Sequence, residues 1–291
     1  MKILDGKKVS NFIAEKIRLE FKKLGEKHVC GGRPKLVIIQ IGNNERSDVY
    51  VKQKKVFGEK LGFEVELIQF DNKISEKDII SKIESLNLDS IVNGIIVQLP
   101  LPKNINILNV IETISPEKDV DGLNSKNLQF LFENGQSENN GFIPATTKGI
   151  ISLLDFYKIP LEGKKVVVVG RSFLFGKPTA LVLLNKNATV TICHSKTKNL
   201  KKEIKNADIA IIAIGKPNFV KKSFVKKGQV IIDVGITKVG NNIFGDVDFK
   251  SVSRIVSAIT PVPGGVGPTT VVSLFENVLT AYKRQQICYN E

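Results

Sequence analysis

The sequence has no tryptophan, only three cysteines and only two histidines among its 291 residues. Cys30, Cys193 and Cys288 are far apart, odd in number and free of any CxxC pair, which argues against a disulfide framework and a cysteine zinc site. The two histidines, His28 and His194, are too few to provide most of the ligands of a histidine metal centre. We therefore expect no bound metal.

Long apolar runs are also missing. No stretch approaches the roughly 20 apolar residues that a membrane-spanning helix needs. Residues 1–12 lack the apolar core of a signal peptide. The composition, 42% hydrophobic and 25% charged, is typical of a globular protein. We expect a cytoplasmic protein without a membrane partner.

Acidic residues are few compared with basic ones, since 43 Lys and Arg against 29 Asp and Glu give a formal net charge of +14. The basic residues are spread along almost every expected helix and mixed with Asp and Glu, whereas nucleic-acid binders usually cluster them on one face. We therefore expect no nucleic-acid partner, and a positive field that attracts small anions. A basic nucleic-acid-binding protein is kept as an alternative.

Residues 164–197 have the pattern of a dinucleotide-binding unit of strand, turn, helix and strand. The first strand ends at Gly170, and a helix begins at Gly176, with Pro178 in the first turn, where a missing N–H costs nothing. The N-terminus of such a helix binds a pyrophosphate. The spacing of Gly170, Ser172 and Gly176 departs from GxGxxG, so an ordinary βαβ unit without a cofactor is the alternative.

The end of the second strand of this unit indicates which dinucleotide is bound. NAD-selective sites place an Asp or Glu there for the ribose hydroxyl. Residues 193–197 contain no carboxylate, and Ser195 stands among them. Arg171 lies in the first turn, on the same rim. A cation with hydroxyl groups favours a 2′-phosphate, so the sequence predicts NADP.

Helices and strands alternate along the chain, which is typical of parallel α/β sheets. Apolar runs predict strands at 36–41, 63–70, 94–99, 164–169, 188–193, 207–214, 228–234 and 257–259. We expect an α/β protein with two domains, a catalytic domain over residues 1–140 and a Rossmann-like NADP-binding domain over 141–266. A closing helix at 267–285 is expected to pack back on the first domain.

Several polar residues of the first domain are placed for chemistry. Tyr50 and Lys54 are four residues apart on an expected helix, so they share one face near the carboxyl edge of the sheet. An aromatic ring beside an amine there can stack a flat substrate and move a proton. Gln98 ends a strand before two prolines and can orient a neighbouring lysine. A solvated surface pair and a capped strand end are the respective alternatives.

Two further segments have unusual composition. Asp119 and Asp121 lie in one turn and offer carboxylates that accept N–H groups from a heterocycle, although Asp-Gly is also a common turn pair. Residues 260–270 are dense in glycine and proline, which indicates a loop shaped to a ligand with a helix N-terminus behind it. A purely structural loop is the alternative.

Taken in order, these segments resemble the bifunctional methylenetetrahydrofolate dehydrogenase/cyclohydrolase family. The resemblance covers nearly the whole chain, and the ordered set is far more specific than any one motif. It rests on Tyr50-x-x-x-Lys54, Gly94–Pro102, Asp119–Leu123, Val169–Ser172 with Gly176 and Pro178, Thr189–Ser195, Ile232–Ile236, Gly245–Val247 and Thr260–Pro268.

The resemblance implies roles for the matching residues of the first domain. Lys54 would be the catalytic lysine that handles the proton as water adds to the methenyl carbon. Gln98 would hydrogen-bond to that lysine and tune it. Tyr50 would stack on the folate ring system, and Asp121 would anchor the amino-pyrimidine edge of the pterin.

The resemblance also implies ligand-binding residues in the rest of the chain. The cofactor site would be lined by Gly170, Arg171, Ser172, Gly176, Ser195 and Ile236. Arg171 and Ser195 would lie near the 2′-phosphate. The glycine-rich loop would contribute Pro263, Gly264 and Gly265 to the folate site.

The family fold implies a cleft between the two domains and a homodimer built through the cofactor domain. The implied reaction is NADP-dependent oxidation of 5,10-methylenetetrahydrofolate to the methenyl form, followed by hydrolysis to 10-formyltetrahydrofolate, a step of one-carbon metabolism linked to purine biosynthesis. Alternatives are a dehydrogenase-only enzyme of the same fold, a different two-domain NADP dehydrogenase such as a shikimate dehydrogenase-like enzyme, and the nucleic-acid-binding Rossmann protein.

Some positions depart from the family pattern. Ala145 and Thr147 stand where the family commonly has Cys and Pro, Phe175 where it has Val, and Thr269 where it has Met. Phe175 is bulky and close to the phosphate turn, so cofactor affinity is the property that these departures affect most. None of them removes a proposed catalytic group.

Overall fold

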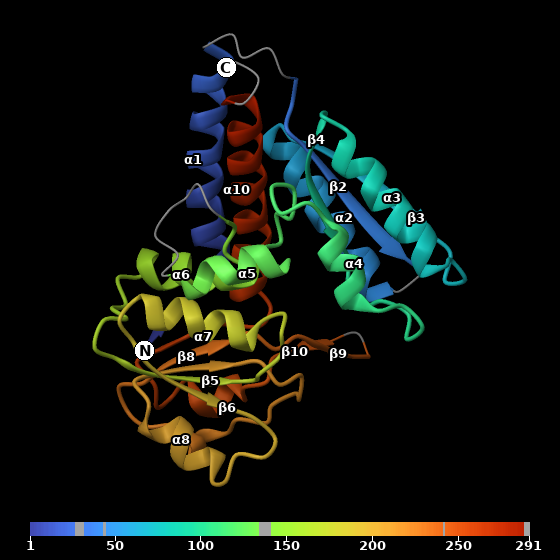
Figure 1. Cartoon of the computed structure of the whole chain (residues 1–291). Helices are drawn as coiled ribbons and strands as arrows, with labels where there is room; N and C mark the ends of the chain where they lie inside the picture. The colour runs from blue at the N-terminus through green and yellow to red at the C-terminus, as the bar shows by residue number, and fades with distance from the viewer. Residues whose placement is uncertain (27–31, 43–44, 134–140, 241, 288–291) are drawn as a thin grey trace. The chain divides into compact units, whose positions relative to one another are not determined.

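The structure is a computed structural model that describes residues 1–26, 32–42, 45–133, 141–240 and 242–287 (Figure 1). Cys30, Cys288 and His28 lie outside these residues. The chain forms two compact units. Unit 1 contains the described residues of 1–12, 131–135 and 146–272, and unit 2 contains those of 13–130, 136–145 and 273–291.

Unit 1 is built on a six-stranded sheet whose paired strands are all parallel. Its strands, in spatial order, are β1 (Lys2–Ile3), β11 (Ala258–Ile259), β8 (Val230–Asp233), β7 (Ile209–Ile212), β5 (Lys165–Val169) and β6 (Thr189–Cys193). The central strands are short β-branched runs buried along nearly their whole length, as expected of a sheet covered on both faces. Five of the six were predicted; β1 is too short to show a periodic pattern.

Helices cover both faces of this sheet. The α7 helix (Gly176–Asn185) lies on one face and α8 (Leu200–Asn206) on the other (Figure 1). Val167 and Val169 of β5 belong to the same buried cluster as Ile204 of α8. The remaining elements of the unit are α6 (Ala145–Phe156, whose first residue is in unit 2), η1 (Lys222–Phe224), α9 (Phe249–Val252) and the antiparallel pair β9 (Thr237–Val239) and β10 (Asn242–Phe244).

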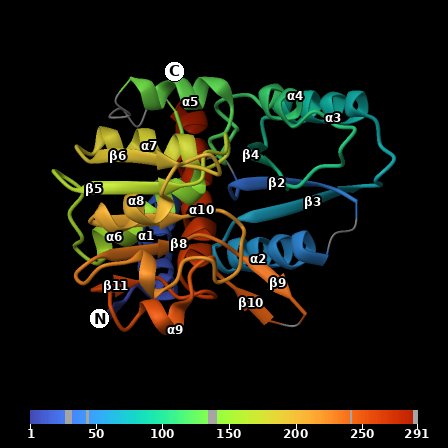
Figure 2. The same cartoon turned by 90° about the horizontal axis from the view of Figure 1, so that it is seen from below.

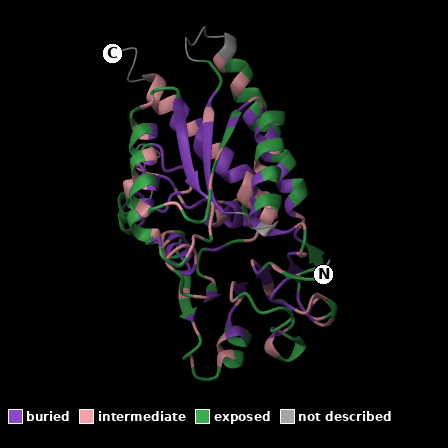
Figure 3. Ribbon diagram, turned by 90° about the vertical axis from the view of Figure 1, so that its right-hand side faces the viewer, coloured by how far each residue is buried: buried purple, intermediate pink, exposed green. Residues whose placement is uncertain are grey.

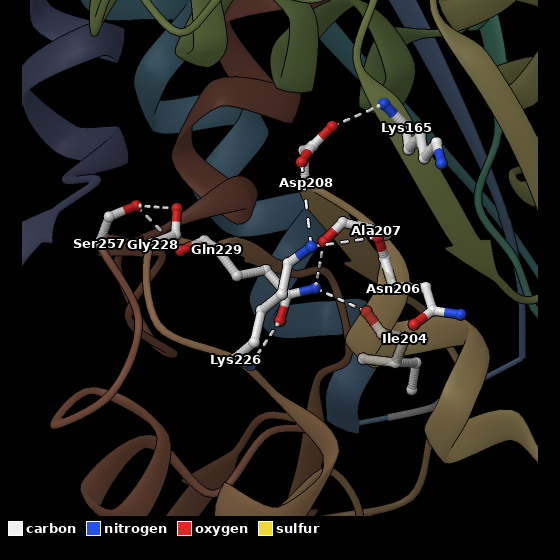
Figure 4. A network of polar contacts seen from close by, with 9 residues as sticks. All are labelled: Lys165, Ile204, Asn206, Ala207, Asp208, Lys226, Gly228, Gln229 and Ser257. Atoms are coloured by element: carbon white, nitrogen blue, oxygen red, sulfur yellow. Dashed lines mark hydrogen bonds and ion pairs between the residues drawn. The ribbon is translucent and has the colours of Figure 1, made fainter.

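A buried glutamine closes the C-terminal end of α8 (Figure 4). The Gln229 side-chain amide donates to the carbonyl oxygens of Ile204 at 2.6 Å and Ala207 at 3.0 Å. Its carbonyl oxygen accepts from the backbone N–H of Lys226 at 3.2 Å. Because the last carbonyls of a helix have no partner within it, this side chain satisfies groups that burial would otherwise leave unpaired.

Unit 2 contains a three-stranded parallel sheet in the order β3 (Glu64–Phe70), β2 (Lys35–Ile41) and β4 (Val92–Val97). The α2 helix (Glu45–Leu61) lies on one face, and α3 (Glu76–Leu88) and α4 (Ile107–Thr113) lie on the other (Figure 2). The strands β2 and β4 are almost completely buried, whereas the outer faces of the helices are exposed (Figure 3). The fold class predicted from the sequence is therefore confirmed for this sheet as well.

Three more helices complete the described chain: α1 (Gly6–Glu26), α5 (Ser125–Phe132) and α10 (Val266–Ile287). Each has residues in both units. None of the helices in the described residues combines the length and the apolar content that crossing a membrane requires.

The start of α1 differs from the sequence-based expectation. Apolar residues at helical spacing between 12 and 24 predict a helix that Ser10 caps, but the helix begins at Gly6, and Asp5 Oδ1 accepts the backbone N–H groups of Lys7 at 2.8 Å and Lys8 at 3.3 Å. Asp is as good a cap as Ser, and the polar residues before Ser10 hid the first turn. At α3 the sequence predicts Ser75 as the cap, in a capping-box-like pattern with Asp78, and the structure confirms it, since Ser75 Oγ accepts the N–H of Asp78 at 3.1 Å.

Two of the departures from the family pattern have compensating contacts in unit 1. The Thr147 and Thr179 hydroxyls are 2.8 Å apart and both residues are buried, so each hydroxyl has a partner. The Thr269 hydroxyl donates to the carbonyl of Val266 at 2.8 Å. A Cβ added at Gly149 would lie within 3.0 Å of Thr269. The α6 helix, which carries Gly149, can therefore lie this close to Thr269 only because position 149 is glycine.

Candidate active site

The proposed lysine of unit 2 lies beside the end of β4. Lys54, on α2, donates from Nζ to Oε1 of Gln98 at 3.0 Å. Gln98 is itself held on both sides, because its backbone N–H donates to the carbonyl of Ile39 and its side-chain amide donates to the carbonyl of Leu99. These bonds leave the amide oxygen directed at the lysine. The structure thus brings together the two residues that the sequence placed on different elements.

Electrostatics at this site favour neutral forms. Burial lowers the pKa of Lys54 below that of an ordinary lysine, and the charge of Asp121 opposes the change. Burial likewise raises the pKa of Asp121, and the charge of Lys54 opposes that change. A lysine with a lowered pKa has more of its neutral amine, which can accept a proton, at neutral pH.

The two carboxylates of the 119–121 turn have different surroundings. Asp119 is 1% exposed, and its oxygens accept from the N–H groups of Gly122 at 3.1 Å and Asn124 at 2.7 Å and from Asn127 Nδ2 at 2.8 Å. Asp121 is only partly buried. Asp119 therefore holds the turn, and Asp121 is the carboxylate available to a ligand. From the sequence alone both Asp119 and Asp121 were candidate ligand-binding carboxylates, and nothing in it distinguished their roles.

Other parts of unit 2 fix the same turn. Asn277 of α10 donates to the carbonyls of Val120 at 2.9 Å and Ile143 at 3.1 Å. Gly122 has φ +71°, and a Cβ there would lie 2.7 Å from the carbonyl oxygen of Phe142, so only glycine fits. Tyr50 is one helical turn before Lys54 on α2 and is partly exposed. Sequence reasoning did not find Asn277, because a lone Asn in a long apolar helix shows no pattern.

The glycine turn after β5 in unit 1 is packed too tightly for any side chain. Gly170 has φ +137°, and a Cβ there would lie 2.5 Å from the carbonyl oxygen of Ala213. A Cβ on Gly176 would lie 2.1 Å from the carbonyl oxygen of Gly170. Phe175, at the N-cap of α7, makes no side-chain cap bond. The two glycines therefore let the N-terminus of α7 pack directly against the turn after β5, where Ser172 Oγ accepts the N–H of Gly176 at 3.4 Å. A helix N-terminus placed in this way after the first strand of a dinucleotide-binding unit is where a pyrophosphate binds.

The rim of this turn carries the residues expected to select the cofactor. Arg171 and Ser172 are exposed after β5, and Ser195 is exposed after β6. The second turn is shaped by Thr197, whose hydroxyl oxygen accepts the backbone N–H of His194 at 2.8 Å. With a cation, hydroxyls and no carboxylate on this rim, the donor set fits a dinucleotide with a 2′-phosphate.

The glycine-rich loop also lies in unit 1. The Gly6 N–H donates to the carbonyl of Gly264, and a Cβ on Gly265 would lie 2.5 Å from the carbonyl oxygen of Pro261. Pro263 is exposed. Ile236 is 42% exposed, and its Cδ1 would lie 3.9 Å from a Cβ on Gly267. The expected site residues therefore form two groups, one in each unit.

Known proteins match this chain over nearly its full length. The catalytic-domain model of tetrahydrofolate dehydrogenase/cyclohydrolase matches residues 4–121, and its NAD(P)-binding-domain model matches residues 144–286. The chain belongs to the tetrahydrofolate dehydrogenase/cyclohydrolase family. The family and the fold class predicted from the sequence are confirmed.

Individual members of the family show how close the similarity is. The chain is 47% identical to the bifunctional protein FolD of Hydrogenobaculum sp. (strain Y04AAS1), over 98% of this chain and 100% of that protein. A crystal structure of the bifunctional FolD enzyme of Campylobacter jejuni matches with a TM-score of 0.92 at 40% identity, covering 98% and 99% of the two chains.

A third relative was solved with a cofactor. The Trypanosoma brucei dehydrogenase-cyclohydrolase, complexed with NADP and an inhibitor, matches with a TM-score of 0.92 at 33% identity over 97% of each chain. These tetrahydrofolate dehydrogenase/cyclohydrolases support the bifunctional interpretation. They give no support to a dehydrogenase-only enzyme or to a nucleic-acid-binding protein.

The buried carboxylate of this family member gives a testable pH dependence. Burial raises the pKa of Asp119 to about 6, more than its N–H donors lower it. The unfolded chain ionises this group near pH 4, so the folded state holds the proton more tightly and loses stability as pH rises from about 4 to about 6. We expect the Asp119→Asn variant to gain up to roughly 3 kcal/mol of unfolding free energy relative to wild type over that range. Urea unfolding at a series of pH values measures the difference.

An exposed turn carboxylate of the same unit serves as the control. The Asp71→Asn change removes an exposed carboxylate that accepts the Lys73 N–H, so it measures the general effect of replacing an Asp by Asn in a turn of this unit. If the Asp119→Asn and Asp71→Asn curves have the same pH dependence, Asp119 does not bind a proton more tightly in the folded state.

Proposed function

We propose that this chain catalyses NADP-dependent oxidation of 5,10-methylenetetrahydrofolate and hydrolysis of the 5,10-methenyl product to 10-formyltetrahydrofolate. The observation that carries the proposal is the Lys54 amine, whose pKa is lowered by burial and which donates to Gln98 in a chain of this family. The tight glycine turn after β5 and the exposed Arg171, Ser172 and Ser195 of unit 1 support the choice of cofactor.

For the oxidation, NADP when bound would supply the hydride acceptor for the methylene carbon, whose hydride leaves with the help of the lone pair of the folate nitrogen. No protein acid is needed, so the chain's task is to bind and orient. We assign the pyrophosphate to Gly170, Ser172 and Gly176, and the 2′-phosphate to Arg171 and Ser195.

The folate site is assigned to other residues. Tyr50 stacks on the ring system, and Asp121 accepts N–H groups from the amino-pyrimidine edge of the pterin. Ile236 borders the cofactor, and Pro263, Gly264 and Gly265 form part of the folate site. These roles come from the family resemblance and agree with the partial exposure of Tyr50 and Asp121 and the exposure of Pro263.

In the hydrolysis, water adds to the cationic methenyl carbon and loses a proton, for which the neutral amine of Lys54 is the acceptor. The bond from this carbon to N5 then breaks, the remaining hydroxyl proton passes to N5, and the formyl group stays on N10. Gln98 orients the amine through its amide oxygen. It adds no charge, so it leaves the pKa of Lys54 low.

We retain the expected division into a folate-binding catalytic domain over residues 1–140 and a cofactor domain over 141–266, with the helix at 267–285 returning to the first. The bounds of the two family models, 4–121 and 144–286, support a change of domain between residues 121 and 144.

Replacing the lysine should separate the two activities. In the Lys54→Gln variant we expect hydrolysis of the methenyl substrate to fall by at least about 100-fold, the scale of a lost general base, while hydride transfer is partly retained. A paired spectroscopic assay with 5,10-methylenetetrahydrofolate follows reduced NADP and the methenyl species together. Wild type should show little methenyl build-up, and the variant should accumulate it.

The neighbouring lysine is a matched control. Lys55 is on the same helix and exposed, so Lys55→Gln should leave both activities within about twofold of wild type. Equal retention of both activities in Lys54→Gln would refute the role given to Lys54. No NADP or NAD reduction by wild type would refute the proposed function itself.

The basic rim predicts cofactor preference. Arg171→Ala removes the cation assigned to the 2′-phosphate, so the KM for NADP should rise roughly tenfold or more, while the KM for NAD changes much less. Arg254→Ala, at an exposed arginine of the same unit, should change neither. Initial-rate kinetics with each cofactor provide the test, and an equal rise for NADP and NAD would contradict the assignment.

We also propose that the chain forms a homodimer through unit 1. The strand β6 pairs only with β5 among the described residues, and Ile192 on it is 40% exposed. Phe132 and Leu184 are 71% and 57% exposed, and the Asn185 side chain ties the end of α7 to the carbonyl of Leu131. An edge strand that is paired on one side only and lies beside exposed apolar side chains is typical of an interface between two copies of a chain.

Sedimentation velocity tests this interface. Wild type should sediment as a dimer, and Ile192→Asp should shift it toward the monomer because two buried carboxylates would face each other across a two-fold contact. Ile243→Asp, at a similarly exposed isoleucine of β10, should leave the dimer intact. A monomeric wild type, or a dimer unaffected by Ile192→Asp, would rule out this surface.

A further inference from the structure

A buried carboxylate of unit 1 holds the turn that follows β7. Asp246 is completely buried, and its oxygens accept three successive backbone N–H groups, from Ile214 at 2.6 Å, Gly215 at 3.0 Å and Lys216 at 2.6 Å. Gly215 and Lys216 themselves are exposed. One side of this turn is thus fixed from within the protein while the other faces solvent.

A second carboxylate fixes Asp246 in turn. Asp233 ends β8 and is 3% exposed. Its Oδ1 accepts the N–H of Asp246 at 3.0 Å, and its Oδ2 accepts the N–H of Val247 at 2.9 Å. The backbone N–H of Asp233 donates to the hydroxyl oxygen of Thr260 at 2.7 Å, which connects the network to the glycine-rich loop.

Glycines make room for both carboxylates. A Cβ on Gly235 would lie 2.1 Å from Cγ of Asp246, and a Cβ on Gly245 would lie 2.0 Å from Oδ2 of Asp233. Such distances exclude any side chain. Ile236 directly follows Gly235, so the backbone that carries this exposed side chain is pressed against Asp246.

The strand order indicates which end of the cofactor these turns meet. In doubly wound sheets the dinucleotide lies across the carboxyl ends of the strands. The residues assigned to the pyrophosphate and the 2′-phosphate follow β5 and β6, on one side of the sheet. The other half of the cofactor then extends over the ends of β7 and β8, where the 214–216 turn and Ile236 lie.

We propose that Asp246 is a positioning residue for the dehydrogenase reaction, which holds the 214–216 turn and Ile236 where they meet the nicotinamide half of NADP. The proposal rests on the proposed function. Asp246 touches neither substrate nor cofactor and acts only through the backbone that it binds. Hydrolysis of the methenyl substrate needs no cofactor. The oxygens of Asp246 bind the 214–216 turn, whereas Asp233 makes the contact with the glycine-rich loop, so a change at Asp246 should spare hydrolysis.

The test is the Asp246→Asn variant, which keeps the shape of the side chain but replaces one acceptor oxygen by a donor. We expect the KM for NADP to rise at least about tenfold and hydride transfer to slow, because charge-assisted bonds to the turn are lost. Hydrolysis of 5,10-methenyltetrahydrofolate without NADP should stay within about twofold of wild type. The KM for the folate in that assay should also be unchanged.

Asp248 provides the matched control. It lies two residues further on and caps α9, where its carboxylate accepts from the N–H and hydroxyl of Ser251. Asp248→Asn should therefore leave both activities within about twofold of wild type. A loss of both activities in Asp246→Asn, or a loss of neither, would overturn the proposal.

A second variant covers the case in which Asp246→Asn does not fold. Gly215 has φ +68°, and a Cβ there would meet nothing within 4 Å, so Gly215→Ala strains the turn without touching the carboxylate. We expect the same selective rise in the KM for NADP with hydrolysis retained. An unchanged KM for NADP in Gly215→Ala would also overturn the proposal. Absent NADP reduction by wild type would instead refute the proposed function.

Discussion

Buried backbone N–H groups in turns need acceptors, and in both units a buried carboxylate supplies them. Asp119 does so in unit 2, and Asp233 and Asp246 do so in unit 1. A carboxylate with several backbone donors fixes a turn more firmly than neutral bonds do. The requirement for glycine at Gly122 and Gly235 follows, because the chain closes tightly around these points.

The electrostatics of the lysine site depend on which partners the lysine has. A carboxylate bonded to Lys54 would hold the amine in its charged form, whereas the neutral Gln98 oxygen accepts a hydrogen bond without adding charge. Asp121 acts through its charge and only opposes the effect of burial. The amine thus stays in place while its pKa is lowered, which a proton acceptor at neutral pH requires.

Much of the fold was predictable because buried parallel strands and amphipathic helices have short-range patterns. The proximity of Lys54 and Gln98 followed from topology, since α2, which carries Lys54, follows β2, and Gln98 follows β4, the strand that pairs with β2. The pairing of β1 with β11, the Gln229 contacts and the different surroundings of Asp119 and Asp121 were not predictable. The first two depend on partners that are distant in the sequence, and the third depends on which carboxylate the turn encloses. Local sequence composition indicates neither of these.

The chemistry explains why one chain can carry both reactions with so few groups. For the oxidation, the protein has only to bind the folate and NADP and orient them. The product has a cationic carbon that is already electrophilic. Hydrolysis of that cation then needs one proton acceptor beside a water molecule, with no nucleophilic residue. The residues assigned to NADP belong to unit 1, and Lys54 and Gln98 belong to unit 2. Because the residues assigned to the cofactor and the Lys54–Gln98 pair lie on different elements, we expect that each step can be altered while the other is preserved.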